Sequence, residues 1–120
     1  MTWTDSDSPP RTNNYKLEWS IQQQLSEWMK TTRLRKDAPV YSCNETAESF
    51  HLIRNGLLGV FLSFSESKRL LVQKICPGET IGLTQMMADE PFPFHVLPIK
   101  ETIAYRGERA DLEKLRTKCP

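Results

Sequence analysis

The chain has 120 residues, of which 16 are lysine or arginine and 15 are aspartate or glutamate, so its formal net charge is +1. A chain of this length supports one domain with a modest core, because it buries only about two-thirds of its unfolded surface. The nearly balanced charge gives no broad electrostatic attraction for nucleic acid, which argues against DNA binding by this segment alone.

The sequence carries no targeting or membrane signal. No apolar run approaches the roughly 20 residues that cross a bilayer, and the N-terminus lacks the basic and apolar regions of a secretory signal. We therefore expect a cytoplasmic protein with no membrane partner. Cys43, Cys76 and Cys119 are scattered, and in a reducing cytoplasm they are best interpreted as free thiols. Because His51 and His95 are also far apart in the sequence, we expect no metal site and no cofactor.

The N-terminal part divides into a polar tail and a helix. Residues 1–14 are rich in Ser, Asp, Asn and Pro, so burial cannot offset the entropy of ordering them, and we expect a flexible tail. Apolar side chains then recur at helical spacing: Leu17, Ile21, Leu25 and Trp28. This stripe predicts a helix from Tyr15 to Thr31. The helix would pack on the domain as a lid, with a partner-binding surface as the alternative.

The segment after this helix is expected to form two short strands. The basic cluster from Arg33 to Lys36 fits a solvated strand entry, with a phosphate-binding patch as the alternative. A proline followed by β-forming residues predicts an edge strand over Ala38 to Cys43. Alternation over Phe50 to Arg54 predicts another strand. The Asn55-Gly56 pair that follows is typical of a hairpin or a bulge, because both residues accept left-handed backbone angles.

The stretch from Phe50 to Leu83 holds the strongest β signals. Apolar side chains fall on one face by period-two alternation: Leu58, Val60, Leu62 and Phe64. The polar segment Ser65 to Lys68 interrupts this pattern before Leu70 to Val72 resumes it, which predicts two antiparallel strands joined by a hairpin. Pro77-Gly78 then predicts a turn, and Gly82 allows a close backbone approach.

The last third of the chain begins and ends with a predicted helix. Leu83 to Glu90 contains helix-forming residues without a breaker, so one or two helical turns are expected. Two strands should follow, over Val96 to Ile99 and over Thr102 to Arg106, and Pro98 confines the first to an edge or a bulge. Glu108 to Lys118 is a predicted helix, with acidic residues early and basic residues late, as the helix dipole favours.

The order of these signals resembles the cyclic-nucleotide-binding fold of the bacterial transcription factors that include the cyclic-AMP receptor and the fumarate-nitrate regulator. In that superfamily a strand followed by Gly precedes a hairpin, a Pro-Gly turn, an apolar residue with Gly, a phosphate-binding cassette, two strands and a helix. Gly56, Pro77-Gly78 and Ile81-Gly82 stand at the corresponding places. The resemblance covers roughly residues 33–118. It is closer to an enterobacterial branch whose last strand reads Ile-x-Tyr-Arg, as Ile103 to Arg106 does here.

The resemblance implies a mainly β fold: a jelly-roll barrel, or double-stranded β-helix, of about eight short strands with N- and C-terminal helices. It assigns residues 15–120 to one sensor domain. In the superfamily the last helix leads into a long dimer helix and a DNA-binding winged helix-turn-helix, and we expect neither in this chain. DNA would then be contacted only through a domain outside this chain, and the chain itself should be a monomer or a weak homodimer.

The cassette departs from the pattern of cyclic-nucleotide binders. In those relatives a glutamate directly after the second glycine contacts the ribose, and an arginine further on pairs with the cyclic phosphate. This chain has Leu83 at the first place and no lysine or arginine from Leu83 to Ile99, so we expect it not to bind cyclic nucleotides. An open cassette pocket would be apolar, unless its side chains simply fill the barrel. Its expected lining is Gly82, Leu83, Met86, Met87, Phe92 and Phe94.

The sequence therefore predicts a regulatory or sensor domain of a transcription regulator of this superfamily, responding to an unknown small ligand or signal. It contains no phosphate loop, nucleophile elbow or other catalytic spacing, so we expect no enzyme activity and no catalytic residues. The alternative is a stand-alone cupin-like domain that binds a small hydrophobic ligand or a metal, and metal binding would need a cluster of histidines.

Overall fold

The computed structural model describes residues 19–65 and 67–118. The tail expected at residues 1–14 and the first residues of the expected N-terminal helix lie outside this part of the chain. The described elements, in chain order, are α1 (Trp19–Trp28), β1 (Lys30–Leu34), β2 (Ser49–Ser65), β3 (Lys68–Ile75), β4 (Thr80–Ile81), α2 (Leu83–Ala88), β5 (His95–Glu108) and α3 (Arg109–Lys118).

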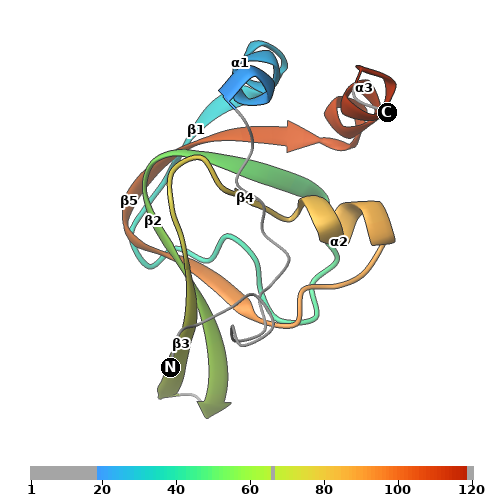
Figure 1. Ribbon diagram of the computed structural model, residues 1–120. Helices are drawn as coiled ribbons and strands as arrows, with labels where there is room; N and C mark the ends of the chain where they lie inside the picture. The colour runs from blue at the N-terminus through green and yellow to red at the C-terminus, as the bar shows by residue number, and fades with distance from the viewer. Residues whose placement is uncertain (1–18, 66, 119–120) are drawn as a thin grey trace, which may run out of the picture.

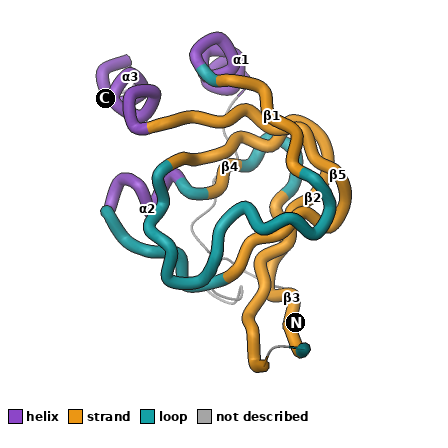
Figure 2. The backbone as a smooth tube through the Cα atoms, turned by 180° about the vertical axis from the view of Figure 1, so that it is seen from behind, coloured by secondary structure: helices purple, strands orange, loops and turns teal. Residues whose placement is uncertain are grey.

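The strands form one antiparallel sheet in the order β1-β5-β2-β3, with β4 paired to β2. β2 and β5 bend along their length, so the sheet curls around the core, with α1 and α3 at one end and α2 beside β4 (Figure 1). Figure 2 shows the same curl from behind. The predicted mainly β, jelly-roll-like fold with flanking helices is confirmed. The sheet, however, is not closed on itself into a barrel.

Five described strands stand in place of the eight short strands that were expected, because two expected breaks are absent. β2 runs through Asn55-Gly56 over 17 residues, so this pair forms a bulge and not a hairpin. β5 runs for 14 residues through the two strands predicted at 96–99 and 102–106. Pro98 lies opposite Leu58, where the register between β2 and β5 shifts, and this irregularity tolerates a residue without an N–H.

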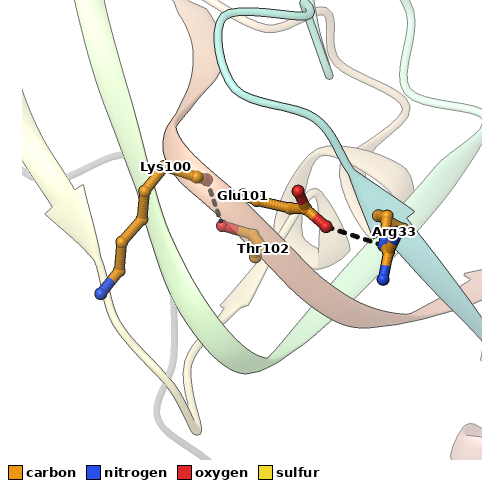
Figure 3. A network of polar contacts seen from close by, with 4 residues as sticks. All are labelled: Arg33, Lys100, Glu101 and Thr102. Atoms are coloured by element: carbon orange, nitrogen blue, oxygen red, sulfur yellow. Dashed lines mark hydrogen bonds and ion pairs between the residues drawn. The ribbon is translucent and has the colours of Figure 1, made fainter.

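The bulge is held by Gly56 and Thr102. Register shifts flank Gly56 on both sides, and its φ is +114°. Across the bulge the buried Thr102 side chain replaces missing backbone pairs, because its Oγ1 accepts from the Leu57 N–H at 3.0 Å. The same Oγ1 donates to the Lys100 carbonyl oxygen at 2.9 Å (Figure 3). Beside it, Glu101 forms an exposed ion pair with Arg33 of β1 at 2.8 Å. Arg33 thus lies on a solvated strand.

Two expectations near the N-terminus were wrong. The first helix ends at Trp28, and Thr31 belongs to β1, because the β-branched Thr31 and Thr32 pair with β5. The edge strand expected over residues 38–43 reduces to an isolated bridge between Tyr41 and Val96. Asp37 and Asn44 have φ of 65° and 68°. These left-handed residues turn the chain just before and just after the expected strand.

The predicted hairpin and turns are confirmed. β2 and β3 pair up to Ser65 and Lys68. The Pro77-Gly78 turn has φ +90° at Gly78, whose N–H donates to the Ile53 carbonyl oxygen at 2.8 Å. Several apolar side chains of the hairpin are exposed: Leu62, Leu70, Leu71 and Val72.

The predicted cassette helix and C-terminal helix are present as α2 and α3. α2 spans Leu83–Ala88, and α3 spans Arg109–Lys118 with Asp111 in its first turn. The Asp111 carboxylate accepts from the Glu108 N–H at 2.8 Å, which caps the start of α3. No described helix has the length and apolar character needed to span a membrane.

Gly56→Ala should strongly destabilise the fold. An added Cβ would lie 2.6 Å from the Thr102 Cα, a backbone atom that cannot turn away, and the φ of +114° is strained for any L side chain. We expect a loss of about 2–4 kcal/mol of unfolding free energy, measured by urea denaturation. Gln24→Ala, on the exposed side of α1, is the control and should change it by less than about 0.5 kcal/mol. Equal effects of the two variants would contradict the bulge geometry.

Candidate functional site

The cassette segment, residues 82–94, is fixed at its start by Gly82. This glycine caps α2 with φ 94°, and Asp89 ends the helix with φ 53°. A Cβ at Gly82 would lie 2.6 Å from Tyr41 Oη and 2.9 Å from the Ser49 carbonyl oxygen. Only glycine avoids both the clash and the strain. The cassette segment therefore meets the sheet at a contact between Gly82 and Tyr41.

The other five residues expected to line a cassette pocket lie in different environments. Leu83, Met86 and Phe92 are brought together as buried members of the core. Phe94 is half-buried and packs against this core. Met87 is separated from them, with 43% of its surface exposed. None of the six expected lining residues belongs to the walls of the two cavities described below.

Arg109 lies outside the cassette segment and forms an ion pair with Asp89 inside it. Asp89 and Glu90 are exposed carboxylates at the end of α2. Nη2 of Arg109, the first residue of α3, donates to Asp89 Oδ1 at 3.2 Å. Sequence reasoning missed this contact because the two residues are 20 positions apart and no local pattern marks either one. Both side chains are exposed, so the pair contributes little to stability, although it places the Arg109 charge against a carboxylate.

Two of the cavities are lined by residues that the structure describes. One, of about 420 Å³, lies between α1, β2, β5 and the Pro77-Gly78 turn. Its walls include Trp19, Arg54 and Tyr105, and the Arg54 guanidinium lies 5.9 Å from the centre of the Tyr105 ring. The other, of about 270 Å³, lies between β1, the loop before β2, and the paired strands β2 and β5. We call it the polar cavity, because five of its residues carry ionisable side chains: Tyr41, Glu45, Glu48, His51 and Arg106.

Tyr41 and His51 form a buried hydrogen-bond network in the wall of the polar cavity. Tyr41 Oη lies 2.8 Å from the Ser49 carbonyl oxygen and 2.7 Å from His51 Nδ1. A carbonyl oxygen can only accept, so the single hydroxyl proton of Tyr41 is assigned to Ser49. His51 Nδ1 must then carry a proton and donate it to Tyr41 Oη. In the neutral ring, Nε2 is left as an unprotonated acceptor.

Burial keeps both rings neutral. Desolvation raises the pKa of Tyr41 far above its usual value. Desolvation, and to a lesser extent the positive charge of Arg106, together lower the pKa of His51 to about 4. Arg106 is the cross-strand partner of His51 in the pairing of β2 with β5. At neutral pH, His51 is therefore an uncharged acceptor beside a cation.

His51 should destabilise the fold as the solution becomes acidic. Its folded-state pKa of about 4 lies below the unfolded value of 6.5, so the unfolded chain binds the proton first. The stability contributed by neutral His51 is complete above about pH 6.5 and is lost as the pH falls towards 4, by on the order of 3 kcal/mol. NMR titration of the His51 Cε1–H measures the pKa directly, and a value near 6.5 would contradict its burial.

A variant pair separates this effect from the titration of carboxylates. His51→Gln should flatten the dependence of unfolding free energy on pH in this range, because the variant has no imidazole to protonate. His95→Gln is the control for loss of a histidine outside the network. An unchanged pH dependence in His51→Gln would show that other groups cause the acid sensitivity.

Solved structures match this fold at low sequence identity. The Thermus thermophilus catabolite activator protein superposes with a TM-score of 0.73 and 13% identity, over 87% of this chain and 49% of that one. A c-di-GMP-responsive global regulator of Xanthomonas campestris gives 0.72 and 10%, over 83% and 49%. A cAMP-binding acyltransferase from Mycobacterium smegmatis gives 0.65 and 20%, over 80% and 30%. The chain thus spans about half of the two regulators and less than a third of the acyltransferase.

Sequence comparison gives the family. No curated protein sequence matches the chain. A profile of the cyclic nucleotide-binding domain family matches residues 31–119, which is more than half of the chain. The match extends from β1 to the end of α3 and includes the cassette segment and the polar cavity. The chain belongs to the cyclic nucleotide-binding domain family.

Proposed function

We propose that this chain is the signal-sensing regulatory domain of a bacterial transcription regulator similar to the cyclic-AMP receptor, acting in the cytoplasm and contacting DNA through a separate domain. Family membership and the fold shared with two regulators support this role. A ligand would act by favouring one geometry of the attached DNA-binding domain. The role requires no catalysis by this domain. Its assembly as a monomer or weak homodimer stays a prediction.

We further propose that cyclic nucleotides are not its signal, and the composition of the cassette segment is the observation that carries this. Leu83 stands where nucleotide-binding relatives place a ribose-binding glutamate, and its side chain is buried in the core. From Leu83 to Ile99 no lysine or arginine is present. A buried phosphate facing leucine, proline and carboxylates loses its charged hydrogen bonds, each worth roughly 1.5–3 kcal/mol.

Cations from other elements do not replace this clamp in the described structure. Arg109 approaches the cassette segment, yet it is bound to Asp89. Arg106 lines the polar cavity, which shares no lining residue with the cassette segment. A phosphate would have to compete with the Asp89 carboxylate for Arg109. To reach Arg106 it would have to bind outside the cassette segment.

An apolar ligand at the cassette segment stays a prediction. For such a pocket to open, Leu83, Met86 or Phe92 would have to leave the core, and exposing one such side chain costs about 1.5–3 kcal/mol. No observation favours the metal-binding cupin-like alternative: within residues 19–65 and 67–118, no group of three or more His, Cys, Asp or Glu is placed to hold a metal ion. The sensor role is therefore the single function that we propose.

Isothermal titration calorimetry with cyclic AMP and cyclic GMP tests the second proposal. Loss of both the ribose and the phosphate contacts should weaken binding by about three orders of magnitude relative to a competent relative. We expect no saturable heat at nucleotide concentrations up to about 100 μM. The cAMP-binding domain of the Mycobacterium smegmatis acyltransferase is the positive control for the nucleotide preparation.

A dissociation constant below about 10 μM for either nucleotide would contradict the proposal. The partner of the phosphate would then be sought by single replacement of four arginines with glutamine: Arg54, Arg69, Arg106 and Arg109. The variant that abolishes the heat would identify the group that replaces the missing clamp.

A further inference from the structure

We propose that the polar cavity binds a small aliphatic amino acid, with the ligand carboxylate on Arg106 and the ligand ammonium group towards Glu48 and His51. The inference deepens the proposed sensor role and rests on it for its biological consequence. Binding itself is independent of the cassette segment, because the polar cavity contains none of its residues. The two proposals can therefore fail separately.

His51 is the first reason to expect a ligand in this cavity. Its side chain lines the cavity, and only 5% of the residue is exposed. Nδ1 lies within hydrogen-bond distance of Tyr41 Oη, at 2.7 Å. Nε2 has no hydrogen-bond partner among the described residues, and solvent can reach it. This nitrogen is therefore an acceptor open to the cavity, to which a bound molecule can donate. An ammonium group supplies such a donor.

The cavity also carries charges of both signs that are not paired with each other. Arg106 is the cross-strand neighbour of His51, and both Arg106 and Glu48 line the cavity. No ion pair joins either residue to another among the described residues. Glu45 also lines the cavity, and its Oε2 accepts from the Ser42 N–H at 2.7 Å. The lining thus carries one cation and two carboxylates, and charges of both signs complement a zwitterion better than an ion of one sign.

The size and the remaining walls select a small ligand. The volume of about 270 Å³ lies just below the range of about 300–1,000 Å³ typical of sites for drug-sized ligands. Leu34, Pro39 and Val40 form an apolar part of the wall. This surface can cover a short aliphatic side chain of the ligand. These features favour amino acids such as alanine, valine or leucine.

Other ligand classes fit these groups less well. For a metal ion, the described residues place no cluster of three metal-ligating side chains there. A nucleotide phosphate would meet the two carboxylates that line the cavity, Glu45 and Glu48. A simple carboxylic acid would satisfy Arg106 but would leave His51 Nε2 without a donor.

Titration calorimetry of the 120-residue protein with each standard amino acid tests the proposal. We expect at least one small aliphatic amino acid to bind with a dissociation constant below about 1 mM. Its methyl ester removes the carboxylate charge and its N-acetyl form removes the ammonium charge, so each should bind at least about tenfold more weakly. Absence of saturable binding by every amino acid at about 10 mM would overturn the proposal.

Variants of exposed residues locate the site without disturbing the core. Arg106→Gln and Glu48→Gln should each weaken binding about tenfold or more, because each removes one charged hydrogen bond. Arg54→Gln, in the wall of the other cavity, should leave the affinity within about twofold. Circular dichroism verifies that all three variants fold. Equal affinity of the wild type and Arg106→Gln, or a loss confined to Arg54→Gln, would overturn the assignment to the polar cavity.

Nucleotide titrations distinguish failure of this inference from failure of the proposed function. Tight binding of cyclic AMP without amino-acid binding would overturn both proposals. Amino-acid binding that Arg106→Gln weakens, together with tight nucleotide binding, would overturn only the claim about nucleotides. Absence of both kinds of binding would overturn the amino-acid site alone.

Discussion

The buried side chain of Tyr41 is the contact on which the arrangement of this domain depends. Its hydroxyl lies within hydrogen-bond distance of His51 Nδ1 in β2, and 3.4 Å from the Ile81 carbonyl oxygen in β4. Its ring stacks on Phe92 at 4.0 Å, and its backbone bridges to Val96 at the start of β5. One residue in a loop thus joins three strands to the cassette segment. Its removal would leave buried polar groups without partners, at a cost of about 1–3 kcal/mol for each group.

The Tyr41 side chain lies between an apolar region and a polar region of the domain. On the cassette side, Leu83, Met86 and Phe92 belong to the core, and Arg109 is paired with the exposed carboxylate of Asp89. On the other side, His51 and its charged neighbours surround a cavity. We infer that sensing in this chain uses the second region.

Structural features that depend on residues adjacent in the sequence could be predicted. Features that depend on contacts between residues far apart in the sequence could not. The hairpin, the Pro77-Gly78 turn and the two later helices follow from local patterns. Asn55-Gly56 suits a hairpin and a bulge equally, and the choice depends on Thr102 across the sheet. Tyr41 was expected in an edge strand, and no pattern indicates that its hydroxyl meets residues 8, 10 and 40 positions away. The candidate polar cavity was missed for the same reason, because its walls come from separate strands and a loop.

The tautomer of His51 tests this account most directly, since both the network and the proposed ligand chemistry depend on it. A two-bond proton–nitrogen correlation spectrum at neutral pH distinguishes the two nitrogens of a histidine ring. We expect a neutral ring protonated on Nδ1, with Nε2 as a free acceptor, because Tyr41 gives its only proton to the Ser49 carbonyl oxygen. A neutral ring protonated on Nε2, or a charged ring, would contradict the hydrogen-bond assignment and the acceptor that it places in the cavity.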